Sequence, residues 1–383
     1  MQIRILVMSQ NRKVFLLSVM SLFVSVCSMA GPLHIKAKID GMTDSVDIHS
    51  AKDNRDGIHC IAKDGYIEVD YEVDHPMLVY LENPDIYRGK KGVQVFFVAM
   101  PDENLEIQGS VDCGYVLGGS HFYEGYNKVY QMFIGSRNRQ NATWNKYDAF
   151  KNRDKTAEEL ARLRDNELQI ERRNLQETLL SFIQRHSNDT YAATAIAYLD
   201  VELMQKGETL LSESVRHGIM KDYYLPLIER EEWRKESATL SKSVQAEGNL
   251  INNFTLEDVD GKMRSLSEFN GKYVVLDFWG SWCGVCIGGF PKMIEYQERY
   301  QDKLQIIGID CNESKEKWKN AVARLNAPWL HLYNGKTAEN NLMKKYAVSG
   351  FPTKILLDHN GRILRVFSGE GDDFYDYLDK LFK

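Results

Sequence analysis

The sequence has few cysteines, no surplus of basic residues and almost no long apolar run. Only 6 of its 383 residues are cysteine, and 54 acidic residues outnumber 48 Lys and Arg residues. A nucleic-acid-binding protein would present a basic face, so the interspersed charges and the net charge of −6 argue against that class. The composition shows no disordered or repetitive block. A chain of this length holds two or three packed units.

The one clear apolar run, Val14 to Val26, follows three basic residues near the N-terminus. It is too short to span a bilayer comfortably. The tripeptide Ser28-Met29-Ala30 fits the small-x-small rule for cleavage, so residues 1–30 are predicted to be an export signal. An uncleaved anchor is one alternative. Lipid attachment at Cys27 is another, although Val26 stands where such sites need a small residue.

Residues 31–119 show the pattern of short strands. Leu33 to Ile39 and Tyr66 to Val73 alternate polar and apolar residues and adjoin Asp-Gly turn signals. Val93 to Met100 and Asn104 to Ile107 add two further strands. This region is therefore predicted to be an antiparallel, sandwich-like β domain.

Residues 120–248 are predicted to be helical. A long charged helix opens at Ala157 and runs towards His186, and a more apolar helix covers Tyr191 to Lys206. Asp222 to Glu247 adds one or two helices, with an interruption expected at Pro226. The apolar faces of these helices are interpreted as core.

Residues 249–383 alternate strands and helices, which predicts right-handed crossovers and a three-layer α/β/α domain. A buried strand is expected at Lys272 to Trp279 and another at Leu304 to Ile309. Two hairpins and further helices complete the pattern, namely hairpins at Asn253–Lys262 and Lys354–Val366 and helices at Lys315–Leu325 and Asp372–Phe382.

The most informative feature is a pair of cysteines, Cys283 and Cys286, between the strand that ends at Trp279 and a predicted helix. At a helix N-terminus the free N–H groups and the dipole favour a thiolate, which is the attacking species in disulfide exchange. The second thiol lies about one turn on, close enough to close a disulfide. The pair is predicted to be redox-active.

A zinc site is the alternative for such a pair. Structural zinc takes four ligands and usually brings a second Cys or His pair at short spacing. No such pair is present in the sequence, because Cys311 stands alone and the histidines are scattered. No metal and no cofactor are therefore expected.

Three motifs in residues 249–383 resemble a known family. They are Val275 to Cys286, then Pro291 five residues after Cys286, and Tyr346 to Thr353. Together they are similar to the TlpA/ResA-like branch of the thioredoxin-fold proteins, which is related to AhpC/TSA. The resemblance implies a thioredoxin fold and an enzyme, a thiol-disulfide oxidoreductase that reduces or isomerises protein disulfides.

The resemblance also implies roles. Cys283 matches the nucleophile and Cys286 the resolving thiol. Pro352 matches the cis-proline that faces the disulfide and docks an extended substrate. Asp277 matches a buried acid that relays a proton to or from the resolving thiol, so its pKa is expected to be raised. Many envelope relatives lack this acid, and the alternative is a solvated carboxylate at the end of a strand.

Further residues near these motifs are expected to contact the substrate: Trp282, Gly284, Val285, Phe351 and Thr353. Trp279 is expected to shape the rim of the site with Trp282, and packing in the core is the alternative for either residue. Two departures from the family pattern stand out. The two residues between the cysteines are Gly-Val, where thioredoxin has Gly-Pro. Because these residues help to set the reduction potential, the reduction potential of thioredoxin cannot be assumed for this protein. Glycines 288 and 289 also soften the following helix.

The same motifs allow two other functions. A thiol peroxidase of the AhpC/TSA type would carry Thr or Ser three residues before the reactive cysteine, and this chain has Gly280 there. A copper-handling protein with the same fold would space its cysteines one residue further apart. Both are therefore less well supported than disulfide exchange.

The resemblance extends faintly to residues 31–248, which look like the leader domain of envelope proteins in gram-negative bacteria. It implies an exported protein of the periplasm or cell envelope, with an N-terminal region that selects partners, forms a homo-oligomer or holds the redox domain at a set distance. The resemblance of residues 249–383 implies disulfide-containing proteins as partners and a DsbD-type membrane electron donor. Whether Cys60 and Cys113 pair is left open by the sequence, and Cys311 is expected to be a shielded free thiol rather than a third redox group.

Overall fold

The computed structural model describes residues 31–42, 44–51, 53–83, 94–110, 113–149, 156–335 and 341–383. The predicted export signal, including Cys27, lies outside the described residues. The strands of the N-terminal part are β1 (Gly31–Asp40), β2 (Ser45–Ser50), β3 (Asp53–Ile61), β4 (Ile67–Val73), β5 (Met77–Glu82), β6 (Gln94–Ala99), β7 (Asn104–Ser110) and β8 (Gly114–Gly118). Its helices are α1 (His121–Asp148), α2 (Ala157–Arg185), the 3-10 helix η2 (Thr190–Tyr198), α3 (Val201–Leu210), α4 (Glu213–Arg216) and α5 (Lys221–Val244).

The described strands before α1 form two four-stranded sheets, ordered β4-β1-β7-β8 and β3-β2-β5-β6. Alternate residues of β1, such as Leu33 and Ile35, are fully buried, as the period-two pattern predicts. One pair departs from the antiparallel expectation, because β1 and β7 run parallel. The chain passes through the other sheet between these strands, and such a crossover is what a parallel pair needs.

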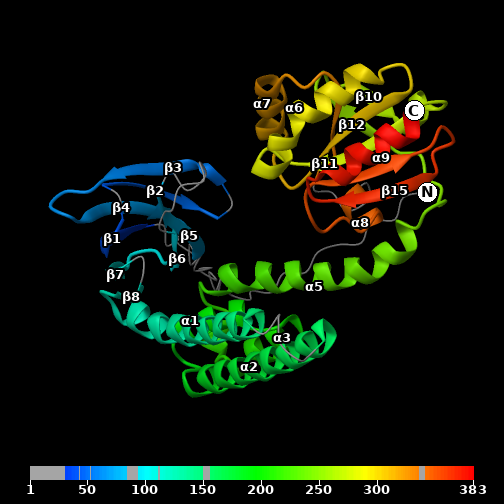
Figure 1. The fold of residues 1–383 in the computed structure, drawn as a ribbon. Coiled ribbons are helices and arrows are strands. Elements are labelled where there is room, and N and C mark those ends of the chain that lie inside the picture. Colours follow the sequence, from blue (N-terminus) through cyan, green and yellow to red (C-terminus); the bar gives the residue numbers. More distant parts are fainter. Residues whose placement is uncertain are drawn as a thin grey trace, which may run out of the picture.

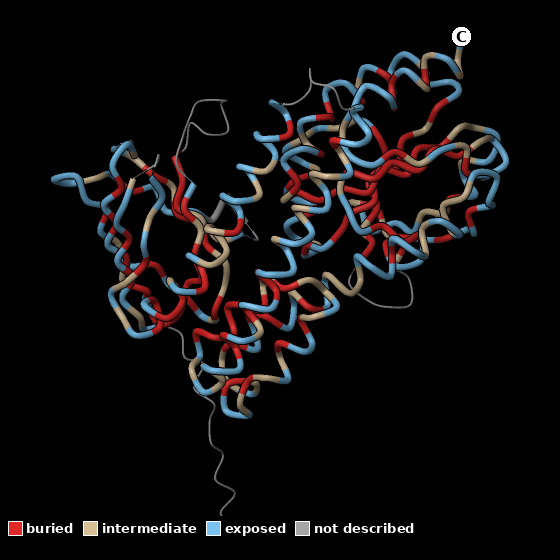
Figure 2. Tube along the Cα trace, turned by 60° about the horizontal axis from the view of Figure 1, so that its bottom comes forward, coloured by how far each residue is buried: buried red, intermediate tan, exposed pale blue. Residues whose placement is uncertain are grey.

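The helices share one hydrophobic core with these sheets. The cluster of buried side chains runs without a break from Leu33 in β1 to Ile228 in α5. Tyr123 of α1 is fully buried and donates a hydrogen bond from its hydroxyl to the Val98 carbonyl of β6 at 2.9 Å. Figure 2 shows buried stretches both in the sheets and in the helices beside them. The β-rich and helical segments therefore pack as one unit.

The prediction of one continuous helix over Tyr191 to Lys206 is wrong, because the segment forms two separate helices. Residues Thr190–Tyr198 form the 3-10 helix η2, and the chain is extended at Leu199 and Asp200 before α3 begins. The buried side chain of Gln176 accounts for the break, because it donates to the Tyr198 carbonyl at 3.1 Å and accepts from the Asp200 N–H at 2.8 Å. A tertiary hydrogen bond thus overrides the helical pattern.

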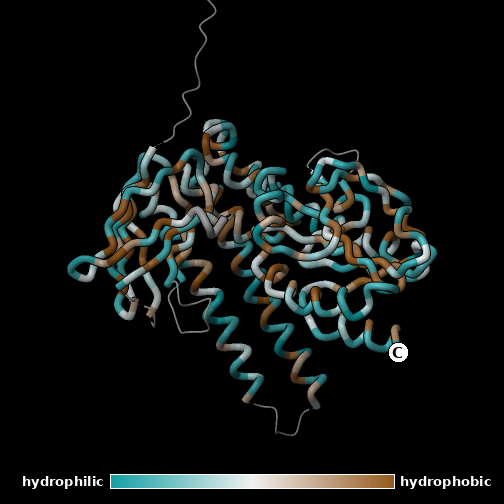
Figure 3. The backbone as a smooth tube through the Cα atoms, turned by 90° about the horizontal axis from the view of Figure 1, so that it is seen from above, coloured by the Kyte–Doolittle hydropathy of each residue, from teal (hydrophilic) through white to brown (hydrophobic). Residues whose placement is uncertain are grey.

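The interruption expected at Pro226 is also absent, since α5 continues through it from Lys221 to Val244. Buried Tyr224 and Ile228 on either side anchor the helix in the core, which offsets the loss of one backbone hydrogen bond at the proline. The long helix α2 begins as predicted at Ala157, where Thr156 and Glu159 form a capping box. Figure 3 shows α1 and α2 lying side by side as a long hairpin.

The C-terminal domain contains β9 (Thr255–Asp258), β10 (Met263–Ser265), the 3-10 helix η3 (Leu266–Phe269), β11 (Tyr273–Trp279), α6 (Gly284–Arg299), β12 (Leu304–Asp310), α7 (Lys315–Leu325), β13 (Leu330–Tyr333), α8 (Leu342–Lys345), β14 (Thr353–Leu357), β15 (Ile363–Ser368) and α9 (Asp372–Phe382). Its described strands are ordered β10-β9-β13-β12-β11-β14-β15. One face of the sheet packs on α6, α7 and α9, and the other on η3 and α8. The three-layer expectation is confirmed.

Strand β11 lies inside this sheet, parallel to β12 and antiparallel to β14. The C-terminal end of helix α5 reaches this domain (Figure 1). Gln245, which follows the helix, donates a hydrogen bond to the Tyr346 carbonyl at 2.6 Å. A further bridge joins Leu250 to Arg362. Within the described residues, no helix combines the length and the apolarity needed to cross a bilayer.

Candidate active site

The two cysteines lie where the buried strand β11 gives way to α6. Cys283 is the N-cap of the helix, and its sulfur accepts a hydrogen bond from the Cys286 N–H at 3.2 Å. A disulfide joins the two residues with an S–S distance of 2.03 Å. The strand-to-helix junction expected from the sequence is therefore confirmed, and the first sulfur lies at a helix N-terminus, where a thiolate is stabilised.

The two cysteine residues differ in their exposure to solvent. Cys283 is 7% exposed and Cys286 only 1%. Val285 between them is 62% exposed, and Gly284 is exposed as well. Cys283 is therefore the more accessible of the two cysteines from solvent.

Two aromatic side chains border the disulfide. The rings of Trp282 and Phe351 contact each other edge to face at 5.1 Å, and the Trp282 indole donates to the Cys311 carbonyl at 2.9 Å. The peptide bond between Phe351 and Pro352 is cis, as expected. These contacts bring the loop before β14 against the start of α6, although the two segments are far apart in the sequence.

Two expectations about neighbouring residues need correction. Trp279 does not shape the rim, because it is fully buried and packs against Phe290 and His331. The side chain of Thr353 is buried rather than available to a substrate, and its hydroxyl donates to the Gly350 carbonyl at 2.8 Å. Period-two alternation places Trp279 on the face of the sheet that α6 covers, and the tight loop before β14 uses the hydroxyl of Thr353 internally.

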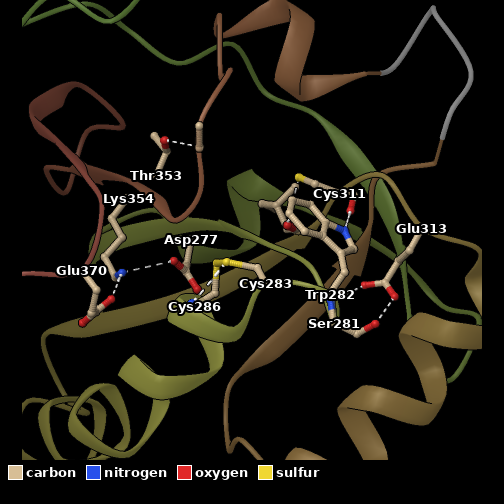
Figure 4. Close-up of a disulfide and its surroundings, with 12 residues drawn as sticks. Asp277, Ser281, Trp282, Cys283, Cys286, Cys311, Glu313, Thr353, Lys354 and Glu370 are labelled. Atoms are coloured by element: carbon tan, nitrogen blue, oxygen red, sulfur yellow. Dashed lines mark hydrogen bonds and ion pairs between the residues drawn. A yellow bond between two sulfur atoms is a disulfide. The ribbon is translucent and has the colours of Figure 1, made fainter. Parts of the chain in front are cut away.

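A buried ion pair lies behind the disulfide. The sequence predicted one of its members, Asp277, but not the other, Lys354. Asp277 of β11 is 1% exposed, and the ammonium of Lys354 lies 3.7 Å from its Oδ1. Burial raises the pKa of Asp277 to about 6; the Lys354 ammonium opposes this rise, and the charge of Glu370 adds to it. Figure 4 shows the Asp277 carboxylate pointing towards the disulfide. The alternative of a solvated carboxylate is thereby excluded.

A second carboxylate holds the turn before Cys283. Glu313 is buried, and its carboxylate accepts hydrogen bonds from the N–H of Ser281, at 2.6 Å, and from the Ser281 hydroxyl. Neighbouring Asp310 is also buried; burial and its interactions with Glu313 raise its pKa to about 9. Asp310 is thus neutral near pH 7.

Known proteins of similar sequence match the domain that contains this site. The family model described as thioredoxin-like matches residues 270–363, which include both cysteines and the cis-proline. Thiol-disulfide oxidoreductase ResA of Bacillus thuringiensis subsp. konkukian (strain 97-27) is 32% identical over 133 residues, covering 34% of this chain and 75% of its own length. ResA of Bacillus subtilis (strain 168) is 29% identical, covering 35% and 75%.

This chain belongs to the ResA-like thiol-disulfide oxidoreductases. Its C-terminal domain has the thioredoxin fold, and the protein is an oxidoreductase. Among solved structures, the thioredoxin domain of a thiol-disulfide oxidoreductase from Bacteroides vulgatus is 30% identical, with a TM-score of 0.33 over 36% of this chain and 99% of that one. The matches with these curated relatives and this solved structure cover about a third of the oxidoreductase.

Three further cysteines of the oxidoreductase lie in the part of the chain that the structure describes, and all three are unpaired. Cys60 is buried and Cys113 exposed, and no bridge joins them. Cys311 is buried, and its thiol donates to the Ile309 carbonyl at 3.4 Å. Burial raises the pKa of Cys311 well above its ordinary value, so it stays a thiol near neutral pH. Within the described chain, no group of three or more His, Cys, Asp or Glu residues is arranged to hold a metal ion.

The contact between Glu313 and Ser281 makes a testable contribution to the stability of the oxidoreductase. Replacing Ser281 with alanine removes one donor from a buried carboxylate, which is expected to lower the free energy of unfolding by about 1–3 kcal/mol. Urea denaturation at pH 7 would measure the change. Alanine at the exposed Ser349 is the control and should alter stability little. Equal losses in both variants would contradict a special role for Ser281.

Proposed function

We propose that this oxidoreductase is exported and reduces or isomerises protein disulfides by dithiol-disulfide exchange through Cys283 and Cys286. The observation that carries the proposal is the position of the pair at the N-terminus of α6. There the Cys286 N–H already donates to the Cys283 sulfur, and Cys283 is the more exposed of the two. The same N–H would stabilise the Cys283 thiolate after reduction.

The exchange takes place in two steps. The Cys283 thiolate attacks one sulfur of a substrate disulfide, forms a mixed disulfide and releases the other substrate sulfur, which takes up a proton. Cys286 then loses its proton and attacks the Cys283 sulfur. This step forms the disulfide seen in the structure and releases the second substrate thiolate. The substrate gains two electrons, and a dithiol donor must restore them to the enzyme.

Asp277 is the proton acceptor for the second step. Its carboxylate is buried behind the disulfide, and a pKa of about 6 lets it be ionised and still basic near neutral pH. The thiol of Cys286 is shielded from bulk water, so an internal base is needed to form its thiolate. The exposed Val285, with Trp282, Gly284, Phe351 and the cis-Pro352 loop, provides the surface against which an extended substrate segment docks.

The wider setting is part of the same proposal. Residues 1–30 act as an export signal, and the protein works in the periplasm or envelope of a gram-negative bacterium, where disulfides persist. Its electron donor is a membrane protein of the DsbD type. The unit formed by residues 31–248 selects partners or mediates homo-oligomer formation.

The trapping of substrates tests the proposal. In a Cys286→Ser variant, Cys283 still attacks, but the mixed disulfide is not resolved, so covalent adducts are expected to accumulate. The reduced variant would be mixed with a disulfide protein such as insulin, and the adducts would be detected on a non-reducing gel. The double variant with Cys283→Ser is the control and should form none. A Cys286→Ser protein that captured no substrate would refute exchange through this pair.

A further inference from the structure

A third ionisable side chain, Glu370, lies behind the disulfide in addition to Asp277 and Lys354. It follows β15, and its side chain is 19% exposed. One carboxylate oxygen accepts from the Lys354 ammonium at 2.7 Å, and the other accepts from the Tyr375 hydroxyl at 2.7 Å. Figure 4 shows Lys354 between the carboxylates of Asp277 and Glu370. The Lys354 side chain is only 2% exposed, so its charge is shared within this group.

A glycine in α6 makes room for Glu370. A Cβ atom built on Gly289 would lie 2.4 Å from the carboxylate carbon of Glu370, closer than any packed side chain allows. The adjacent Gly288 differs, because a Cβ there would meet nothing within 4 Å. Glycine inside a helix is unfavourable by about 1 kcal/mol relative to alanine. Of these two glycines, only Gly289 has a steric reason for this loss of helix stability.

The distances indicate how Lys354 divides its attraction. Its ammonium is 2.7 Å from Glu370 but 3.7 Å from Asp277, so the outer carboxylate holds it more closely than the inner one. In a buried site such charges act strongly on one another. Without the charge of Glu370, the Lys354 ammonium would attract the Asp277 carboxylate more strongly. The repulsion between the Glu370 and Asp277 carboxylates would also be lost, and both changes favour the ionised form of Asp277.

We propose that Glu370 is a positioning residue for the proton transfer from Cys286 to Asp277: by holding Lys354, it determines how readily Asp277 accepts the proton. The inference rests on the proposed function and deepens it. Glu370 does not touch the reacting sulfurs. It acts through Lys354, and Gly289 is the position that admits its carboxylate.

Other titratable groups also surround this site. Asp277 lies beside Cys286 of α6 (Figure 4), and its charge also acts on the thiol of Cys311, which follows β12. Burial raises the pKa of the Cys311 thiol, so that thiol stays neutral. On the outer side, Tyr375 of α9 donates to Glu370, while Lys292 is paired with Asp372 at 2.6 Å. With Cys311 neutral and Lys292 already paired, Lys354 is the cation that both carboxylates share.

The charge on Asp277 gives the direction of the expected effect. Glu370 raises the pKa of Asp277 and Lys354 lowers it, so a Glu370→Gln variant should have a more acidic Asp277. The acid limb of the pH–rate profile should then move to lower pH, by about half a unit or more. A purely structural role, in which Glu370 only neutralises buried Lys354, would change stability without moving this limb.

The experiment compares full-length reduced proteins as they are oxidised by insulin between pH 5 and pH 9, with tryptophan fluorescence as the readout. Glu370→Gln is expected to shift the acid limb downwards. Gly289→Ala should shift it in the same direction, because the new methyl group displaces the Glu370 carboxylate. Gly288→Ala is the matched control and should reproduce the wild-type profile, since it meets open space.

The outcomes separate the two proposals. If Glu370→Gln or Gly289→Ala folds and oxidises with an unshifted profile, the role of Glu370 is wrong and the exchange function stands. If one of them does not fold, the other still decides the matter. A wild-type protein that fails to exchange disulfides with insulin at any pH would instead overturn the proposed function, and the role of Glu370 with it.

Discussion

A Cys283→Ser variant is expected to lose disulfide-reductase activity by about a thousandfold or more. Serine does not form an anionic nucleophile near neutral pH, and it cannot form the disulfide that links residue 283 to Cys286. Cys311 cannot replace it, because Cys311 is buried with a thiol that resists ionisation. The measurement is the rate of insulin reduction, with dithiothreitol as electron donor and the uncatalysed rate subtracted.

The exposed free thiol of Cys113 provides the control for this prediction. A Cys113→Ser variant has lost a thiol that is open to solvent but lies outside the candidate site, so its activity should equal that of the wild type. If Cys283→Ser retained more than a small fraction of the wild-type rate, a different cysteine would have to carry the reaction. If Cys113→Ser lost activity instead, the assignment of the reactive pair would be wrong.

An Asp277→Asn variant is expected to be more stable than the wild type above pH 6. The pKa of Asp277 is about 6 in the folded protein and 3.8 ordinarily, so the carboxyl binds its proton more tightly when folded. Its contribution to stability is therefore present at low pH and lost as the pH rises through about 6. The difference corresponds to about 3 kcal/mol at pH 8. Asparagine avoids this loss, and Lys354 keeps Glu370 as its partner.

Urea denaturation at pH 8 and at pH 4 would measure the effect. Tryptophan fluorescence is a suitable signal, because Trp279, Trp318 and Trp329 are buried in the C-terminal domain. The gain should shrink to less than about 1 kcal/mol at pH 4, where the folded carboxyl is already protonated. Asp302→Asn, at an exposed turn, should show no such pH dependence. A gain of equal size at both pH values would show that the charge of Asp277 is not the cause.

Local patterns in the chain predicted the elements that frame the site. The apolar run before Trp279 and the cysteine spacing after it placed the reactive pair at a strand-to-helix junction, and the structure confirms this junction. The start of α2 at Ala157 and the alternation in β1 were predicted equally well. Each of these features depends on residues within one or two turns, or within one strand, so the sequence carries it directly.

Where the prediction was wrong, contacts between distant segments decided the outcome. Gln176 breaks the chain between Tyr198 and Asp200, and core packing on both sides keeps α5 continuous through Pro226. The parallel pairing of β1 with β7 likewise follows from the path of the chain through the other sheet. Local propensity is small in comparison with tertiary packing and hydrogen bonding, and it is overruled in such places.

The sequence by itself determined where the two cysteines stand, between a buried strand and a helix, because the apolar run and the cysteine spacing are local features. Only the tertiary structure decided what surrounds the sulfurs. Register pairs Asp277 with Lys354 across two strands, and Gly289 admits Glu370 from a loop 81 residues later in the chain. Glu313 holds Ser281 in a similar way from the end of another strand. Burial gives these charges their influence, and burial exists only once the domain has folded.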